Sequence, residues 1–325
     1  MLPDAWAALR GLPLRPAEDG GLINKTWLAG DPARWVVQWV NPIFAETVHL
    51  DIEAVTAHVA RKGMVTPRLL RTDAGALSAR GEDGVWRAMD FIPGRTIQRV
   101  DSPAIAREGA ALVARFHAAL DDLDHTYQHV RAGAHDTHLH MQRLDEAAVG
   151  GDGRAVADGI LAAWATWEGR LDLPERHAHG DLKISNLRFD GEGRGLCLLD
   201  LDTLARLPLD IELGDAWRSW CNPVGEDAVE ARFDLDLFAA AVDGYRGVRA
   251  WSEQEGANLV AGIERIALEL SARFCRDVYE DRYFGWNAAR FPTRAAHNLF
   301  RARGQLALAH SIRAQRTAAE RFVLG

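Results

Sequence analysis

The chain has 325 residues, more than one compact core of ordinary size requires, so we expect two lobes or domains. Hydrophobic residues make up 48% and charged residues 26%, which excludes a disordered chain. The net charge of −8 argues against broad attraction to nucleic acid or anionic lipid, so any bound phosphate must be held by local groups or metal ions.

The first part of the chain alternates short β-branched and aromatic runs with turn signals. Asp31-Pro32 separates two of these runs, as in a hairpin, and a third run closes at Pro93-Gly94. Between them lies a segment whose apolar residues recur at helical spacing. Strands are predicted over 22–30, 34–40 and 85–94, and a helix over 45–63.

Alanine-rich segments with helical spacing dominate the rest of the chain. Helices are predicted over 102–120, 153–170, 234–245, 253–275 and 293–317, with a loop-and-strand segment over 177–203. We therefore predict an α+β fold with two lobes. A small N-terminal β-sheet lobe with one main helix covers residues 1–92, and a larger, mainly helical lobe covers 93–325.

The three cysteines form no Cys-x-x-Cys pair, which predicts a reduced protein without a disulfide framework or zinc cluster. The first residues, MLPDAWAALRGL, contain no basic leader followed by an apolar stretch, and no apolar run approaches membrane-spanning length. We expect a cytoplasmic protein with no membrane partner and no nucleic-acid partner.

The segment HGDLKISN (179–186) has the His-x-Asp and Asn spacing of a kinase catalytic loop. In such a loop a carboxylate accepts the hydroxyl proton as the phosphoryl group leaves ATP, and we assign this role to Asp181. The amide of Asn186 is spaced to reach a magnesium ion on the phosphates. Lys183 is placed to neutralise the transferring phosphoryl group.

A second aspartate, Asp200, ends the apolar run in LCLLDLDT (196–203), which is predicted to be a buried strand. A rigid strand end suits a carboxylate that holds Mg²⁺ between phosphates, so Asn186 and Asp200 are the predicted metal ligands. Singly, these residues would be read as turn formers and a strand cap. Their order and spacing together predict phosphoryl transfer with ATP and Mg²⁺.

Three neighbouring side chains have supporting roles in this interpretation. Asp202 either binds the metal or bonds to the backbone near Thr203, and we favour the backbone. Asp215 is predicted to accept hydrogen bonds from the catalytic loop. His179 is predicted to be a structural hydrogen-bonding group, because Asp181 already has the proton-transfer task.

The nucleotide side of the site begins at EDGGLINKT (18–26), where two glycines lie between predicted strands. Backbone N–H groups can approach phosphates closely at glycine because no Cβ intervenes. An ordinary hairpin turn is the alternative. The residues assigned to nucleotide binding in this segment are Gly20, Gly21, Asn24 and Lys25.

Kinase-type lobes carry a lysine on the third strand, paired with a glutamate of the following helix. Here the strand offers Gln38, and Glu53 is the helix partner. A Gln38–Glu53 hydrogen bond would keep the geometry without the charge, which Lys25 would supply. Adenine is expected at the backbone of residues 89–92, so Met89 and Phe91 complete the predicted nucleotide site.

These motifs resemble those of the aminoglycoside phosphotransferase superfamily, which also holds choline and homoserine kinases. The likeness is greatest to the N-acetylhexosamine 1-kinase branch and extends from about residue 18 to 312. The motifs that carry it include GGLINKTW, VWRAMDFIPG, AHDTH, LCLLDLDT, LGDAWRS, ARFCRDVYEDRYF and HNLFRARGQLAL. The resemblance implies a protein-kinase-like two-lobe fold, and this branch tolerates glutamine on the third strand.

The resemblance further implies that Arg273 and Tyr283 contact a sugar. One departure is Leu22, where better-known members of the branch have a histidine that helps to hold the sugar. The expected activity is ATP- and Mg²⁺-dependent transfer to a sugar hydroxyl, most directly the anomeric hydroxyl of an amino sugar or hexose. An aminoglycoside, choline or homoserine-like acceptor stays open, as does a nucleotide-binding pseudokinase.

Overall fold

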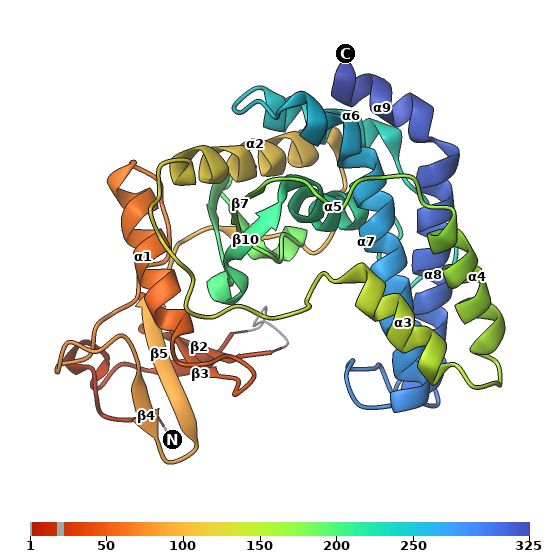
Figure 1. The fold of residues 1–325 in the computed structure, drawn as a ribbon. Coiled ribbons are helices and arrows are strands. Elements are labelled where there is room, and N and C mark those ends of the chain that lie inside the picture. Colours follow the sequence, from red (N-terminus) through yellow and green to blue (C-terminus); the bar gives the residue numbers. More distant parts are fainter. Residues whose placement is uncertain (1, 18–22) are drawn as a thin grey trace.

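A five-stranded antiparallel sheet forms the core of the N-terminal part (Figure 1), in the order β1-β2-β3-β5-β4. The computed structural model describes residues 2–17 and 23–325, so Gly20, Gly21 and Leu22 lie outside the described residues. The strands are β1 (Leu14–Pro16), β2 (Lys25–Ala29), β3 (Trp35–Val40), β4 (Ala79–Gly81) and β5 (Gly84–Asp90).

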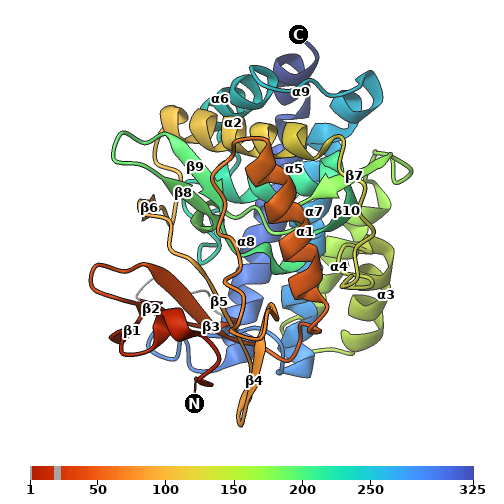
Figure 2. The same ribbon diagram turned by 90° about the vertical axis from the view of Figure 1, so that its left-hand side faces the viewer.

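Both faces of this sheet are covered. One face packs apolar residues such as Val37 and Ala88 against Trp6 of the N-terminal segment, which contains the short helix η1 (Ala7–Leu9). On the other side, α1 (Val48–Arg61) buries Ile52 and Val55 in the main core of the molecule. Figure 2 shows α1 rising from the sheet toward α2 of the larger part, which it contacts.

The larger part is built around α7 (Glu253–Glu280), which is buried along most of its length and packs on α3, α5 and α8. A capping box formed by Ser252 and Glu255 fixes its start. The other helices are α2 (Pro103–Leu120), α3 (Thr137–Ala147), α4 (Arg154–Ala165), α5 (Leu209–Trp220), α6 (Leu235–Arg246), α8 (Arg294–Ala314) and α9 (Arg316–Leu324).

Two small sheets lie among these helices and carry the chemistry-bearing loops. One contains β6 (Arg95–Thr96), β8 (Leu187–Phe189) and β9 (Gly195–Leu198), and the other pairs β7 (Glu175–Ala178) with β10 (Ala205–Pro208). Short 3₁₀ helices, η2 (Ile184–Asn186) and η3 (Leu201–Thr203), follow or precede these strands.

The predicted α+β, kinase-like two-lobe fold is confirmed, with an N-terminal sheet and a larger helical part. The helices predicted in the second part are present, although the last one divides at Gln315 into α8 and α9. Helices α3 and α5 were not predicted. The limits 1–92 and 93–325 stay a proposal for the two lobes. Among the described residues, no helix has the length and apolarity needed to cross a membrane.

Candidate active site

The predicted catalytic loop joins β7 to β8 and is anchored by one buried carboxylate, Glu212 of α5. Glu212 accepts the backbone N–H of His179 at 2.7 Å and that of Gly180 at 2.9 Å. Burial alone would raise the pKa of Glu212, but hydrogen bonds from His117 and the loop hold it below its usual value. The prediction for Asp215 is wrong: it accepts from Arg218 at 2.8 Å, and Glu212, one helical turn earlier, supports the loop.

His179 is a structural hydrogen-bonding group, as predicted. Its Nε2–H donates to the Leu199 carbonyl at 2.8 Å, and its Nδ1 accepts the backbone N–H of Asp181 at 3.3 Å. The next residue, Gly180, has φ +81°, and a Cβ there would collide with the Thr203 carbonyl oxygen. Glycine is therefore required for the loop to pass this close to the segment after Asp200.

The structure brings Asp181, Lys183 and Asn186 together. Lys183 Nζ lies 2.9 Å from Asp181 Oδ2, and Asn186 Nδ2 donates to the same oxygen at 3.1 Å and to the Asp181 carbonyl at 2.8 Å. Burial would lower the pKa of Lys183, but Asp181 and Asp200 raise it, so the ammonium stays charged. The proposed base is thus held by a cation and an amide on its own loop.

Asp200 lies two residues after the end of β9 in a left-handed backbone conformation, with φ 58° and ψ 59°. This region is unfavourable for a residue with a Cβ and is found preferentially at functional sites. No hydrogen bond from the described residues reaches its carboxylate, in contrast to Asp181 and Asp202. Burial, and then the charges of Asp202 and Asp181, raise the pKa of Asp200 to about 7.

The donor set fits a divalent cation of the magnesium type. The Asp200 carboxylate is without a hydrogen-bond donor in the described part of the chain, and the Asn186 amide uses its nitrogen, not its oxygen, toward Asp181. Oxygen ligands of this kind are those that Mg²⁺ prefers. A cation would also offset the burial and the carboxylate repulsion that raise the pKa of Asp200.

Asp202 has a role that the sequence did not indicate. Its carboxylate receives both terminal nitrogens of Arg87 from β5, with Nη2 at 2.7 Å, and Asn24 Nδ2 at 2.6 Å. The side chains of Arg87 and Asp202 are each 1% exposed. The predicted bond of Asp202 to the backbone near Thr203 is therefore wrong, and a buried ion pair joins the sheet to the larger part.

The expected hydrogen bond between Gln38 and Glu53 is absent from the described structure. Gln38 lies opposite Arg87 in the β3–β5 register and accepts from its Nε at 2.8 Å, while Glu53 accepts from Arg71 at 2.8 Å. The cation that β3 lacks is thus present on the adjacent strand. An arginine inside the apolar run VWRAMDF was the one available sequence signal for it.

The α1 side chain close to Arg87 is His49, and not Glu53 as expected. It is 2% exposed, its Nδ1–H donates to the Glu46 carbonyl at 2.8 Å, and its Nε2 has no partner among the described residues. Burial and the positive charge of Arg87 lower the pKa of His49 to about 4, so the ring is neutral.

Lys25 points away from this buried cluster. Thr26 and Gln38 bond to each other across β2 and β3, so Lys25 and Trp39, one residue along on each strand, lie on the opposite face. On that face the Lys25 ammonium lies 5.0 Å from the centroid of the Trp39 ring. Its predicted contact with nucleotide phosphates stays a prediction.

The segment expected to receive adenine presents a limited set of open backbone groups. The N–H of Phe91 already donates to the Arg34 carbonyl at 3.0 Å, and Met89 pairs with Val36 and Leu69. The Ile92 carbonyl accepts from Arg188 at 3.0 Å. The Phe91 carbonyl and the Ile92 N–H have no partner within the described ranges. These two groups are the acceptor and the donor that an adenine edge requires.

The two residues carried over from the family resemblance lie together at the C-terminal end of α7. The Arg273 guanidinium lies 5.8 Å from the centroid of the Tyr283 ring, and its Nη2 lies 3.5 Å from the phenol oxygen. A third residue, Arg131, donates to the same oxygen at 3.1 Å. Burial would raise the pKa of Tyr283, but Arg273 and Arg131 lower it below its usual value.

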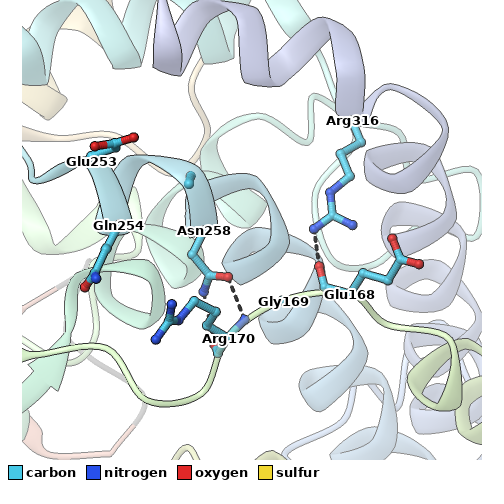
Figure 3. A pocket seen from close by; sticks show the side chains of 8 residues that line it. Glu168, Gly169, Arg170, Glu253, Gln254, Asn258 and Arg316 are labelled. Carbon is cyan, nitrogen blue, oxygen red and sulfur yellow. Dashed lines mark hydrogen bonds between the residues drawn. The ribbon is translucent and has the colours of Figure 1, made fainter.

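An open hollow on the helical part contains none of the predicted site residues (Figure 3). Asn258 accepts the backbone N–H of Arg170 there at 2.7 Å, and Arg316 bonds to the Glu168 carbonyl. The histidines of 135–140 also serve separate contacts: His135 with Glu269, His140 with the Ala134 carbonyl, and His138 with the Trp164 ring.

Comparisons with solved structures find similar folds at low sequence identity. An aminopropanol kinase associated with a microcompartment has a TM-score of 0.64 and 15% identity, over 95% of this chain and 94% of that chain. An aminoglycoside phosphotransferase from Alicyclobacillus acidocaldarius has a TM-score of 0.61 and 16% identity, over 98% and 97%. An amicoumacin kinase in complex with AMP-PNP, Ca²⁺ and Ami has a TM-score of 0.60 and 12% identity, over 91% and 90%.

A comparison with curated proteins finds no match. The profile of the phosphotransferase enzyme family matches residues 14–251, which include the catalytic loop, Asp200, Arg87 and Glu212. This match spans well over half of the chain. The chain therefore belongs to the phosphotransferase enzyme family.

Proposed function

We propose that this phosphotransferase transfers the γ-phosphoryl group of ATP to a hydroxyl of a sugar, with Mg²⁺ as the metal ion. The observation that carries the proposal is the grouping of Asp181, Lys183 and Asn186 beside Asp200, whose carboxylate receives no hydrogen bond from the described residues. Supporting it, the amicoumacin kinase of similar fold was solved with AMP-PNP and Ca²⁺, a nucleotide and a divalent cation.

Each residue in this group has one task. Asp181 accepts the acceptor's hydroxyl proton and orients that hydroxyl through its negative charge. Asn186 and Asp200 would hold the metal ion, which when bound would neutralise charge on the phosphates. Lys183, kept protonated by Asp181 and Asp200, offsets negative charge on the transferring group.

The nucleotide would bind to the N-terminal sheet and to residues 89–92, where the chain leaves the sheet. Gly20, Gly21 and Lys25 flank the phosphates, and Asn24 is tied to Asp202 at 2.6 Å. Gln38 contributes through its hydrogen bond from Arg87, whereas Glu53 on α1 pairs with Arg71 and has no direct contact with this group in the described structure. Adenine bonds to the open Phe91 carbonyl and Ile92 N–H, beside the partly buried Met89 side chain.

For the acceptor, we propose a hexose or amino sugar phosphorylated at its anomeric hydroxyl, with Arg273 and Tyr283 orienting the ring. This step rests on the resemblance to the N-acetylhexosamine 1-kinases. The second candidate is an amine-bearing acceptor, favoured by the aminoglycoside and aminopropanol kinases of similar fold. The third, a pseudokinase, loses its argument because Arg87 supplies a cation beside the third strand.

A coupled ADP-release assay over sugars, aminoglycosides and amino alcohols tests the proposal. Each accepted sugar is then compared with its 1-O-methyl glycoside, in which the anomeric oxygen has no proton to give. A 1-kinase fails on the glycoside, whereas rapid phosphorylation of the glycoside moves the reaction to another hydroxyl. ADP release with amino alcohols or aminoglycosides alone would reject the sugar acceptor.

A further inference from the structure

A cationic cluster lies at the end of α7. It consists of Arg131, Arg273 and Tyr283, with both arginines reaching the phenol oxygen. Among the described residues, no carboxylate forms an ion pair with either guanidinium. Other arginines nearby do have such partners: Arg276 and Arg282 both pair with Glu280. In a chain of net charge −8, two guanidiniums that meet at one oxygen with no ion-pair partner in the described part of the chain need an explanation.

The cluster is fixed in place by the protein itself. Asp277, 1% exposed, accepts the backbone N–H groups of Arg282, Tyr283 and Phe284 at 3.1, 2.9 and 2.8 Å. Asn298 donates to the same carboxylate at 2.9 Å. The Arg273 guanidinium lies 5.8 Å from the centroids of both the Tyr283 and Phe284 rings. The groups that would meet a ligand are therefore pre-organised, which lowers the cost of binding.

The cluster lies on the side of α7 that faces the catalytic loop. Ile266 packs against Gly214 of α5, and Arg273, seven residues later, lies on the same face about 10 Å further along the axis. Asp215, next to Gly214, is one of the charges that raise the pKa of Lys183. In Figure 1 the segment between α2 and α3, which includes residue 131, passes α1 before it reaches α3.

We propose that Arg131, Arg273 and Tyr283 bind an oxyanion on the acceptor, so that the substrate is an acidic sugar bearing a carboxylate or a phosphate ester. This rests on the proposed sugar kinase function and names the class of sugar. Guanidinium groups bind carboxylate and phosphate oxygens through short charge-assisted hydrogen bonds, and the phenol adds a third donor. A cationic acceptor would instead meet two uncompensated positive charges.

The test uses four hexoses with a free anomeric hydroxyl that differ in charge: glucose, glucosamine, glucuronate and glucose 6-phosphate. We expect kcat/KM for glucuronate or glucose 6-phosphate to exceed that for glucose by tenfold or more, and the better of the two identifies the oxyanion. Arg131→Gln should raise KM for that sugar about ten- to a hundredfold, at least ten times the change seen with glucose. Arg282→Gln, an exposed arginine of the same loop paired with Glu280, is the matched control.

A preference for glucose or glucosamine, or an equal loss for all four sugars in Arg131→Gln, would overturn the proposal and leave the cluster a packing role. Calorimetric titration of glucuronate and inorganic phosphate into nucleotide-free protein, with and without Arg131→Gln, measures the site independently of turnover. Arginine-dependent binding without ADP release from any sugar would keep the oxyanion site and reject the sugar kinase. ADP release confined to neutral sugars would keep the sugar kinase and reject the oxyanion site.

Discussion

Three aspartates close to one another in the candidate site differ in what holds their charge. Asp181 has Lys183 and Asn186, and Asp202 has Arg87 and Asn24, whereas no donor among the described residues reaches Asp200. Burial would raise the pKa of Asp202, but Arg87 holds it below its usual value. Burial, and then the charges of Asp202 and Asp181, raise the pKa of Asp200, and it is the carboxylate that a cation would stabilise.

Replacing Asp181 by Asn keeps the size of the side chain and removes the proton acceptor. Loss of a general base lowers the rate by about a hundred- to ten-thousandfold. We expect kcat to fall in that range while the affinity for ATP and metal changes little, because Asn186 and Asp200 remain. Steady-state kinetics with a fluorescent nucleotide titration separate the two effects. Near-normal turnover in a folded variant would remove Asp181 from the mechanism.

The raised pKa of Asp200 predicts an opposite effect of pH on the metal-free and metal-bound protein. Between about pH 5 and 7 the folded state holds a proton on Asp200 that the unfolded chain has released, so stability falls as pH rises. Mg²⁺ needs the ionised carboxylate, so its stabilising effect should grow over the same interval.

Thermal unfolding from pH 5 to 8, with and without Mg²⁺, measures this. The comparison with Asp200→Asn isolates the residue, because His49 and other groups titrate in both proteins. Relative to the variant, the wild type should lose stability as pH rises without metal and regain it with Mg²⁺. Parallel curves for the two proteins would show that Asp200 does not take up this proton.

At the scale of elements, β3 and β5 share the role of the third-strand lysine of kinase-type lobes: β3 supplies the position and β5 supplies the cation. Gln38 on β3 accepts from Arg87 on β5, its register partner, and Arg87 reaches Asp202. Lys25 on β2 lies over Trp39 instead, in a contact that at an exposed site is worth only about 0.5–1 kcal/mol. Breaking the contact between Lys25 and the ring would therefore cost little, whereas Arg87 is committed to the ion pair.

This division predicts different results for two alanine variants. Lys25→Ala should weaken ATP more than AMP, because only the outer phosphates would lose a charge. Gln38→Ala should lower kcat with a smaller change in nucleotide affinity, because it disturbs Arg87 without removing its charge. Calorimetry with both nucleotides, alongside kcat, checks the pair. An equal loss of ATP and AMP affinity in Lys25→Ala would indicate a folding role for Lys25.

The sequence predicted elements best where periodicity and burial agree, as in α2 and α7 with their regular apolar faces. It did not predict α5, whose buried face includes Asp210 and Glu212, because polar residues at core positions break the apolar pattern. The catalytic loop was recognisable because its chemistry requires a fixed spacing. Its anchor, Glu212, and the Arg87–Asp202 pair depend on contacts between distant segments, which no local spacing records.

At the scale of the whole molecule, two sets of buried polar contacts tie the sheet and α1 to the helical part. Asn24 and Arg87 meet Asp202, which follows β9. Asp51 of α1, 1% exposed, accepts the backbone N–H groups of Gln128 and His129 at 2.8 Å each. The first contact lies two residues from Asp200, so its stability and the geometry of the candidate site are coupled.

Breaking the Arg87–Asp202 pair from one side should therefore be costly. Removing one partner of a buried ion pair leaves an uncompensated charge, which costs about 3–5 kcal/mol, whereas replacing both by apolar residues is often nearly neutral. We expect Arg87→Met and Asp202→Leu each to lower the free energy of unfolding by that amount. The double variant should be more stable than either single variant, because no buried charge remains.

Urea unfolding of the wild type, the two single variants and the double variant gives the four free energies of a double-mutant cycle. Amide hydrogen exchange in β3 and β5 shows whether the loss of stability is located in the sheet. If the pair also ties the two parts together, exchange should rise in these strands in the single variants and fall back in the double variant. Kinetics then separate stability from catalysis: the double variant should be folded but slow, since the ion pair two residues from Asp200 is lost. Additive losses of stability in the double variant would mean that the two side chains contribute independently, and the ion pair would no longer account for the connection between sheet and helices.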